Sequence, residues 1–199
     1  MEHRDEKILA LLNESEKASV PLNICTGPVR VGSRFYEFEQ QGFWDNKVCL
    51  FIPKEFEDMP DHLRAVKYPY QQRPQIIKSD ETSGINFTLS RVDQDLQDQW
   101  VKQLTAGMKA TIKKTNPANV FYTDGVEMVG GKQVGYFEFK SPALDGFLYH
   151  LMFFLALEGK MVMGTFCCPF AEYGEWREIA FQVMRTVSVT EENEGEEQG

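Results

Sequence analysis

The clearest alternation of apolar and polar positions lies between Val126 and Val187, in the last third of the chain. Apolar runs there are interrupted by turn-forming residues at 130–131, 141–146 and 158–159, and this order predicts three antiparallel strands. One run, Phe147–Leu157, is apolar on both faces, so the sheet that holds it must be covered on both sides. A closing helix is predicted by a single apolar face made of Trp176, Ile179, Ala180, Val183 and Val187.

A second helical pattern lies in the middle of the chain, where apolar residues recur at every fourth position. This stripe consists of Leu96, Trp100, Leu104, Met108 and Ile112, with Val101 widening it. The predicted start is acidic, with Asp93, Asp95 and Asp98, and the predicted end is basic, with Lys109, Lys113 and Lys114. Each sign is the one that the helix dipole favours at that end. The pair Asn116-Pro117 predicts the end of the helix.

Shorter elements are predicted before this helix. The runs 29–38 and 43–52 each predict a strand, and Pro53 ends the second one because proline cannot donate to a central ladder. A short helical turn is predicted over 61–66. The runs 75–78 and 85–91 predict a hairpin around the turn residues 80–84.

Long gaps between strands, filled by two substantial helices, predict an α+β fold over a doubly wound one. We expect a largely antiparallel β-sheet with helices on both faces, a three-layer α/β/α sandwich. The predicted organisation is an N-terminal amphipathic helix over residues 1–18, one α+β domain over 19–189 and a disordered acidic tail over 190–199. The tail expectation follows from five glutamates and no apolar side chain among the last nine residues.

The formal net charge of -9 falls to about -4 when these five glutamates are set aside, so the folded part has an ordinary surface. An acidic chain with no basic stripe repels phosphate backbones, which excludes nucleic acid as the expected partner. The charged N-terminus does not have the pattern of a signal peptide. The run 147–157 falls well short of the roughly 20 residues of a membrane-spanning helix. We therefore expect no membrane insertion.

The cysteine pattern favours a reducing compartment. Four cysteines show no metal-type spacing, and we expect reduced, mostly buried thiols in a cytoplasmic protein with no metal or cofactor. Cys167 and Cys168 are adjacent, so in a strand they point to opposite faces and do not share a site. His150 sits among apolar neighbours and is interpreted as a satisfied buried or edge histidine. The sequence contains no recognised motif of a nucleophilic, phosphate-binding or metal-dependent enzyme.

The stretch from about Gly42 to Val189 resembles the Mog1/PsbP-like fold, including the bacterial DcrB-type proteins within it. The resemblance is carried by the strand pair around 131–140 and 149–155, by Gly159-Lys160-Met161, by 166–169 before the Trp176 helix, and by 51–56 upstream. It implies a binding role, because members of this fold act as accessory subunits, GTPase-binding factors or chaperone-like adaptors and share no catalytic centre. The resemblance does not cover the first 40 residues.

Aromatic and proline residues near predicted turns supply the candidate binding residues. The segment Tyr68-Pro69-Tyr70-Gln71-Gln72-Arg73-Pro74 combines stiff prolines with residue types that are enriched in protein interfaces. The candidate protein interface consists of Trp44, Phe56, Tyr68, Tyr70 and Arg73. A loop folded back on its own core explains the same segment equally well.

Two hypotheses of function follow. The first is a non-enzymatic cytoplasmic adaptor or chaperone-like factor whose partner is another protein. The alternative is a small-ligand carrier or enzyme with a pocket between sheet and helix, reached by His150 or Cys168. The apolar residues Ile8, Leu11 and Leu12 of the predicted N-terminal helix need a cover, which docking on the domain, a homodimer or a bound client would each provide.

Overall fold

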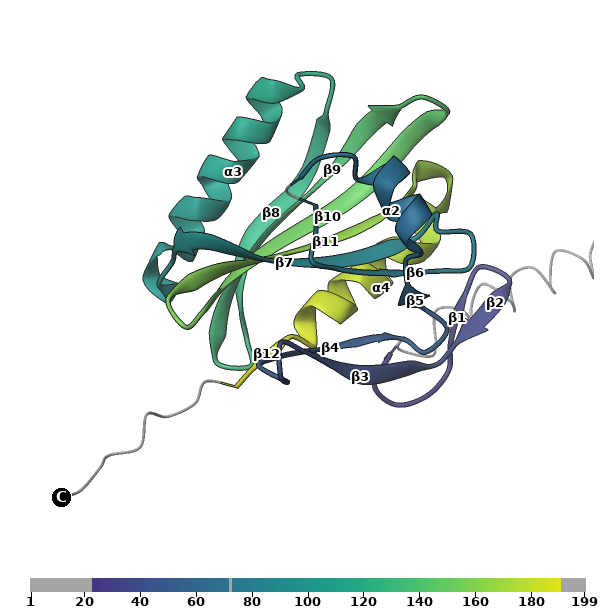
Figure 1. Cartoon of the computed structure of the whole chain (residues 1–199), viewed down its shortest axis with the longest axis horizontal. Helices are drawn as coiled ribbons and strands as arrows, with labels where there is room; N and C mark the ends of the chain where they lie inside the picture. Colours follow the sequence, from purple (N-terminus) through teal and green to yellow (C-terminus); the bar gives the residue numbers. More distant parts are fainter. Residues whose placement is uncertain (1–22, 72, 191–199) are drawn as a thin grey trace, which may run out of the picture.

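The computed structural model describes residues 23–71 and 73–190 (Figure 1). The helix predicted over 1–18 lies outside the described residues, and so does the predicted tail from residue 191 onward. The first part of the chain forms β1 (Val29–Val31), β2 (Arg34–Tyr36), β3 (Phe38–Phe43), β4 (Val48–Pro53), β5 (Glu57–Asp58), α2 (Asp61–Lys67) and β6 (Ile76–Ser79). The second part forms β7 (Asn86–Asp95), the 3-10 turn η1 (Asp98–Trp100), α3 (Val101–Thr115), β8 (Val120–Val129), β9 (Lys132–Ala143), β10 (Gly146–Leu157), β11 (Lys160–Pro169), the 3-10 turn η2 (Phe170–Glu172), α4 (Tyr173–Arg185) and β12 (Ser188–Val189).

A seven-stranded antiparallel sheet forms the centre of the molecule, in the order β5-β6-β7-β11-β10-β9-β8. Strands β8 to β11 follow one another as a meander, because each pair is joined by a short turn. The turn between β10 and β11 places Glu158 and Gly159 at positive φ, which suits a tight hairpin. As the apolar run predicted, the second half of β10 is buried on both faces.

Helix α3 covers one face of this sheet, over β8, β9 and β10. Its Val101 is fully buried against Phe137 and Phe154, and partly buried Leu104, Met108 and Ile112 extend the contact. This face of the sheet and α3 form one hydrophobic core.

Helix α4 covers the opposite face and lies between the large sheet and a small three-stranded sheet, β12-β4-β3 (Figure 1). Trp176 of α4 is the centre of this second core, with its ring 5.1 Å from Tyr36, 5.9 Å from Phe56 and 5.8 Å from Phe166. Leu50 and Ile52 of β4 close the far side of the helix. The expected α+β fold, an antiparallel sheet with a helix on each face, is therefore confirmed.

Three predictions about strands were wrong. The last third of the chain has four meander strands, where the sequence predicted three. The predicted strand over 29–38 divides into β1, β2 and the start of β3, because Gly32 adopts a positive φ of 60° and reverses the chain. The predicted strand over 43–52 begins only at Val48, because 44–46 form the β3–β4 turn with φ between 52° and 62°.

The central helix starts later than predicted. β7 runs on to Asp95, and the ammonium of Lys160 on the neighbouring strand lies 2.8 Å from both Asp93 and Asp95. These two carboxylates therefore belong to a strand and not to a helix start. Trp100 precedes α3 in a 3-10 turn and is exposed, so it is not part of the buried stripe.

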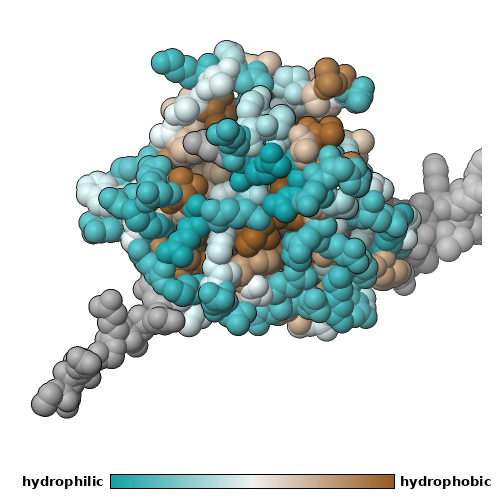
Figure 2. All heavy atoms as spheres, viewed as in Figure 1, coloured by the Kyte–Doolittle hydropathy of each residue, from teal (hydrophilic) through white to brown (hydrophobic). Residues whose placement is uncertain are grey.

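The predicted hairpin formed by β6 and β7, the short α2 and the stop at Pro53 are as the sequence indicated. The face of the molecule that Figure 2 shows is mostly hydrophilic, with separate small hydrophobic patches. Among the helices of the described segments, none has the length and apolarity to cross a membrane.

Candidate functional site

A buried charge network lies where β9, β10 and α4 meet. Glu138 of β9 is completely buried, and Arg177 of α4 donates to both of its oxygens, Nε to Oε2 at 3.0 Å and Nη2 to Oε1 at 2.7 Å. The Tyr149 hydroxyl donates to Oε2 at 2.7 Å, and the Thr123 main-chain N–H donates to Oε1 at 3.3 Å. Burial alone would raise the pKa of Glu138, but these hydrogen bonds outweigh burial and hold the pKa below its ordinary value. The carboxylate is therefore charged at neutral pH.

Aromatic rings cover this network toward the solvent. Tyr173, at the start of α4, lies 4.8 Å from Tyr149, 5.2 Å from Phe170 and 5.9 Å from Tyr122 between ring centroids. The Phe170 and Tyr173 rings are stacked, at an interplanar angle of 13°. Because these rings come from β8, β10, η2 and α4, four elements have to pack before the cluster exists.

Lys140 extends the cluster. Its ammonium lies 4.0 Å from the centre of the Phe147 ring and 4.3 Å from that of Phe170. Within the part of the chain that the structure describes, Lys140 forms no ion pair with a carboxylate. Its positive charge is held by two aromatic faces, an arrangement that contributes about 0.5–2 kcal/mol. We call the group formed by Tyr122, Lys140, Phe147, Phe170, Tyr173 and Arg177 the aromatic surface.

Local sequence explains why these side chains converge. Lys140 and Glu138 are two positions apart on β9 and so share a face of the sheet. Tyr173 and Arg177 are four positions apart on α4 and so stand one turn apart on the same side. Phe147 follows the tight turn at Gly146, whose φ of 130° suits glycine.

The aromatic surface is open to solvent. Phe147 is 51% exposed and Tyr122 is 39% exposed, while Phe170 and Tyr173 are half-buried. Aromatic rings and arginine are the side chains that most often dominate binding energy in protein interfaces. The rings are also held in place by mutual stacking, which lowers the entropy lost when a partner immobilises them.

The structure does not bring the five interface residues predicted from sequence together. Phe56 is buried in the core, 5.9 Å from both Trp176 and Phe87, so its ring is not accessible. Trp44 lies in the β3–β4 turn and packs partly on the core. Tyr68 is half-buried, and burial raises its pKa. Tyr70 and Arg73 are exposed.

The residues of the aromatic surface were missed because each has an ordinary place in its own element. Lys140 and Phe147 flank a predicted turn, and Tyr173 opens a predicted helix. The available signal was a lysine within an aromatic strand next to a Pro142 and Gly146 turn. That signal shows which residues lie near the turn between two strands, but not that η2 brings Phe170 beside them.

His150 and the cysteines form no catalytic arrangement. The His150 ring stacks on Phe139 at 4.7 Å, its Nε2 is hydrogen-bonded to the Ser141 hydroxyl at 2.8 Å, and burial lowers its pKa to about 4. It is therefore the satisfied histidine that the sequence indicated. Cys168 packs in the α4 core, while Cys167 lies on the other face opposite His150, so the two thiols do point apart.

All four cysteines are free, but the expectation that most are buried was wrong. Cys168 is buried, Cys49 and Cys167 are half-buried, and Cys25 is exposed. Burial raises the pKa of the Cys167 thiol to about 12, so it is protonated at neutral pH. Over the described residues, no group of three or more His, Cys, Asp or Glu side chains is placed to hold a metal ion.

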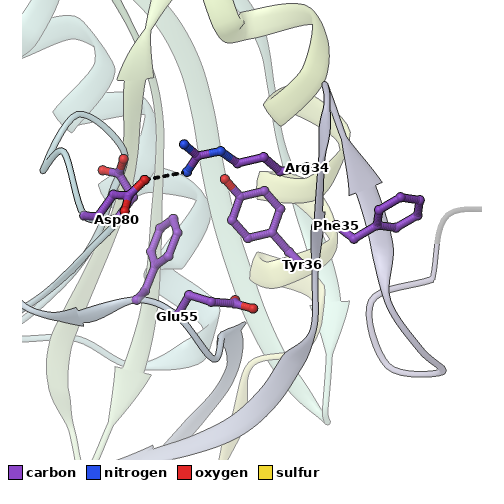
Figure 3. A pocket seen from close by; sticks show the side chains of 7 residues that line it. Arg34, Phe35, Tyr36, Glu55 and Asp80 are labelled. Atoms are coloured by element: carbon purple, nitrogen blue, oxygen red, sulfur yellow. Dashed lines mark hydrogen bonds and ion pairs between the residues drawn. The ribbon is translucent and has the colours of Figure 1, made fainter.

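A shallow pocket of about 210 Å³ lies beside β2, away from the predicted position between sheet and helix. Figure 3 shows Arg34 reaching toward the 80–81 turn, where it pairs with Glu81 at 2.8 Å, while the Phe35 ring turns away. Ligand pockets usually enclose about 300–1,000 Å³ and bury most of the ligand. This pocket is smaller and its ion pair is solvent-exposed, so it does not support a small-molecule site.

Comparison with known proteins identifies the fold. No family model and no curated protein matches the sequence. Among solved structures, cyanobacterial PsbP (CyanoP) from Synechocystis sp. PCC 6803 aligns with a TM-score of 0.57 and 8% identity, over 80% of this chain and 96% of that chain. The chain has the Mog1/PsbP-like fold.

Two further structures align with a TM-score of 0.49. The Ran-binding protein Mog1p of Saccharomyces cerevisiae has 11% identity, over 77% of this chain and 96% of that chain. LpqN, involved in cell envelope biogenesis of Mycobacterium tuberculosis, has 12% identity, over 81% of this chain and 95% of that chain. At these identities the likeness concerns the fold alone.

Proposed function

We propose that this protein is a non-enzymatic protein-binding module, an adaptor or chaperone-like accessory factor that works in the cytoplasm. The observation that carries the proposal is the aromatic surface, where Lys140 lies between two rings and Phe147 and Tyr122 face the solvent. A protein partner would cover these rings and meet a cation that has no carboxylate beside it. Free thiols at all four cysteines agree with a reducing compartment.

The buried network supports the proposal by making the surface rigid. Arg177 is fixed by two hydrogen bonds to Glu138, and Glu138 also accepts a hydrogen bond from Tyr149, whose ring lies 4.8 Å from the Tyr173 ring. A binding surface that is already ordered loses less conformational entropy on association. Tyr70 and Arg73, both exposed on the loop after α2, are kept as a second, smaller contact region.

The alternative function, a ligand carrier or enzyme, has weaker support. His150 already has a hydrogen-bonding partner, and Cys168 is buried in the α4 core. The pocket near Arg34 is lined by neither of these two residues. A ligand screen by thermal shift tests it, since a ligand at 100 times its Kd would stabilise the fold by roughly 2.7 kcal/mol.

Affinity capture with matched variants tests the proposal. The purified protein, Phe147→Ser and Val66→Ser are each used to capture proteins from cells that produce the chain. Phe147 and Val66 are both exposed, but Val66 lies on α2, outside the aromatic surface. We expect one partner to be recovered by the wild type and by Val66→Ser and to be lost with Phe147→Ser. Recovery of no specific partner, or equal recovery by all three, would contradict the proposal.

A further inference from the structure

Two Asp-Gly pairs in this chain have opposite surroundings. In such a pair the aspartate side chain can react with the next main-chain nitrogen, because glycine has no Cβ to hinder the approach. The sequence contains Asp124-Gly125 and Asp145-Gly146, and it contains no Asn-Gly pair. Because the dipeptide is the same at both places, any difference in reactivity between them comes from the fold.

The first pair, Asp124-Gly125, is held inside β8. Both residues are paired with β9, Asp124 opposite Phe137 and Gly125 opposite Tyr136. The Asp124 carboxylate also accepts a hydrogen bond from the Lys109 ammonium. A Cβ at Gly125 would lie 2.9 Å from the Tyr136 hydroxyl oxygen, so this glycine is closely covered. The first pair can therefore react only when β8 opens.

The second pair, Asp145-Gly146, lies at the tip of the hairpin formed by β9 and β10. Leu144 and Asp145 make its two-residue turn, between the paired residues Ala143 and Gly146. Asp145 and Gly146 are both exposed, and a Cβ at Gly146 would meet no atom within 4 Å. Among the residues that the structure describes, no partner holds the Asp145 carboxylate through a hydrogen bond or an ion pair. Turn tips of this kind open at little cost in free energy.

We propose that Asp145 is a site of spontaneous isoaspartate formation. The Gly146 main-chain nitrogen attacks Cγ of the Asp145 carboxyl group and forms a new N–Cγ bond. One carboxyl oxygen leaves as water, with the carboxyl proton and the amide proton of Gly146. The resulting succinimide ring then adds a water molecule at one of its two carbonyl groups.

Opening of the ring at the main-chain carbonyl of Asp145 gives isoaspartate. This step breaks the original peptide bond to Gly146, so the chain now runs through Cγ and the α-carboxylate becomes the side group. One water molecule is released and one is taken up, and no oxidant, reductant or cofactor is consumed. The reaction therefore needs only the chain and its solvent.

The product would disturb the turn in which it forms. Isoaspartate adds one carbon atom to the main chain, and a two-residue turn fixes the register of the strands that it joins. Phe147 follows directly, with its ring centre 4.0 Å from the Lys140 ammonium. We expect the modification to move Phe147 away from Lys140 and to loosen this end of the hairpin. The site does not depend on the proposed function, but its product would alter the aromatic surface.

The test is incubation of the full chain near neutral pH, folded and in concentrated urea. Digestion followed by mass spectrometry with electron-transfer fragmentation measures isoaspartate at both pairs. In the folded chain we expect residue 145 to convert at least about tenfold faster than residue 124, because reaction at 124 requires strand opening. In urea the two rates should agree within about twofold, because both pairs are then in an unfolded chain.

Three variants identify the reacting group. Asp145→Glu should remove the product at 145, because its longer side chain does not form the five-membered ring. Asp145→Asn should speed conversion at 145, because ammonia is then the leaving group. Asp124→Glu is the matched control at the other pair and should leave conversion at 145 unchanged.

Amide hydrogen exchange of the aged protein measures the structural consequence. We expect faster exchange over 138–149 and unchanged exchange over α2. Three results would overturn the proposal: equal conversion at the two pairs in the folded chain, a difference between them that persists in urea, or product at 145 in Asp145→Glu. If isoaspartate forms as expected while partner capture does not depend on Phe147, the modification site stands and the proposed function fails.

Discussion

At the scale of single residues, two arginines of α4 make the same kind of contact in different surroundings. Arg177 binds Glu138, which is completely buried, and Arg185 binds Glu127, which is partly exposed at the sheet edge. Both guanidinium groups also lie over the Phe181 ring, at 5.0 and 5.3 Å. If each arginine is replaced by methionine, the difference in lost stability between the two variants therefore reports on the burial of the partner carboxylate.

We predict that Arg177→Met lowers the free energy of unfolding by about 3 kcal/mol at pH 7, because it leaves a buried carboxylate without its cation. Arg185→Met should cost less than about 1 kcal/mol, because Glu127 stays hydrated. The pKa of Glu138 is lowered in the folded wild type, so Glu138 contributes to stability above the pKa that it has in the unfolded chain. This contribution is lost as the pH falls through the pKa that it has in the folded protein. The Arg177→Met deficit should therefore shrink near pH 4. Urea unfolding at both pH values measures this, and equal losses for the two variants would contradict it.

His150 makes a second pH-dependent prediction. Burial lowers its pKa to about 4, so the unfolded chain binds a proton near pH 6.5 that the folded chain does not. Stability is therefore present above pH 6.5 and is lost as the pH falls from 6.5 toward 4. We expect the wild type to lose about 2 kcal/mol more than His150→Gln between pH 7 and pH 4.5. Parallel pH profiles of the two proteins in chemical denaturation would show that His150 titrates normally.

At the scale of elements, the contact between α3 and β9 depends on Gly135. A Cβ at this position would overlap Thr105 Oγ1 and lie 3.0 Å from Val101 Cγ1, both on α3. We predict that Gly135→Ala lowers the free energy of unfolding by about 1–3 kcal/mol through overpacking. Gly107→Ala, on α3 itself with open space around the position, should raise it by about 0.5–1 kcal/mol. Thermal unfolding separates the two, and a stabilising Gly135→Ala would show that α3 is not packed closely on the sheet.

Elements with a repeating pattern were predictable, and those set by single residues were not. The two buried faces of β10 and the buried face of α4 were read correctly because their apolar patterns extend over ten or more residues. The start of α3 was placed too early because the four-residue repeat extends by chance through Trp100 to Leu96, which both precede the helix. The chain reversal at Gly32 could not be predicted, because a single glycine hardly changes the apolar pattern of the short run 29–38. The local pattern did not reveal that Lys160 of another strand holds Asp93 and Asp95.

At the scale of the whole molecule, the fold class followed from the order of the elements and the two buried faces of β10. The aromatic surface did not, because Lys140, Phe147 and Phe170 become neighbours only after the meander and η2 have packed. The loop at 68–74 attracted attention because its residue types are common in interfaces, but its Tyr68 turns toward the molecule. The family resemblance and the residue types of this loop led to the binding hypothesis, and the packing of the described residues supports the different place that we propose for it.

The two ends of the chain lead to a further prediction from sequence. Deleting 190–199 should leave the melting temperature nearly unchanged, because these residues include no apolar side chain after the strand ends at Val189. Deleting 1–18 should lower the melting temperature or change the oligomeric state, because Ile8, Leu11 and Leu12 require cover. Calorimetry with size-exclusion chromatography measures both. A destabilising C-terminal deletion, or an N-terminal deletion without effect, would contradict these expectations.

The most direct test of the account is amide hydrogen exchange of the protein alone and in complex with its captured partner. Binding through the aromatic surface predicts slower exchange over 120–124, 138–149 and 168–177, where its six residues lie. Exchange over α2 should not change. Protection confined to α2 and the loop after it, or to α3 on the opposite face of the sheet, would contradict the claim that the aromatic surface binds the partner.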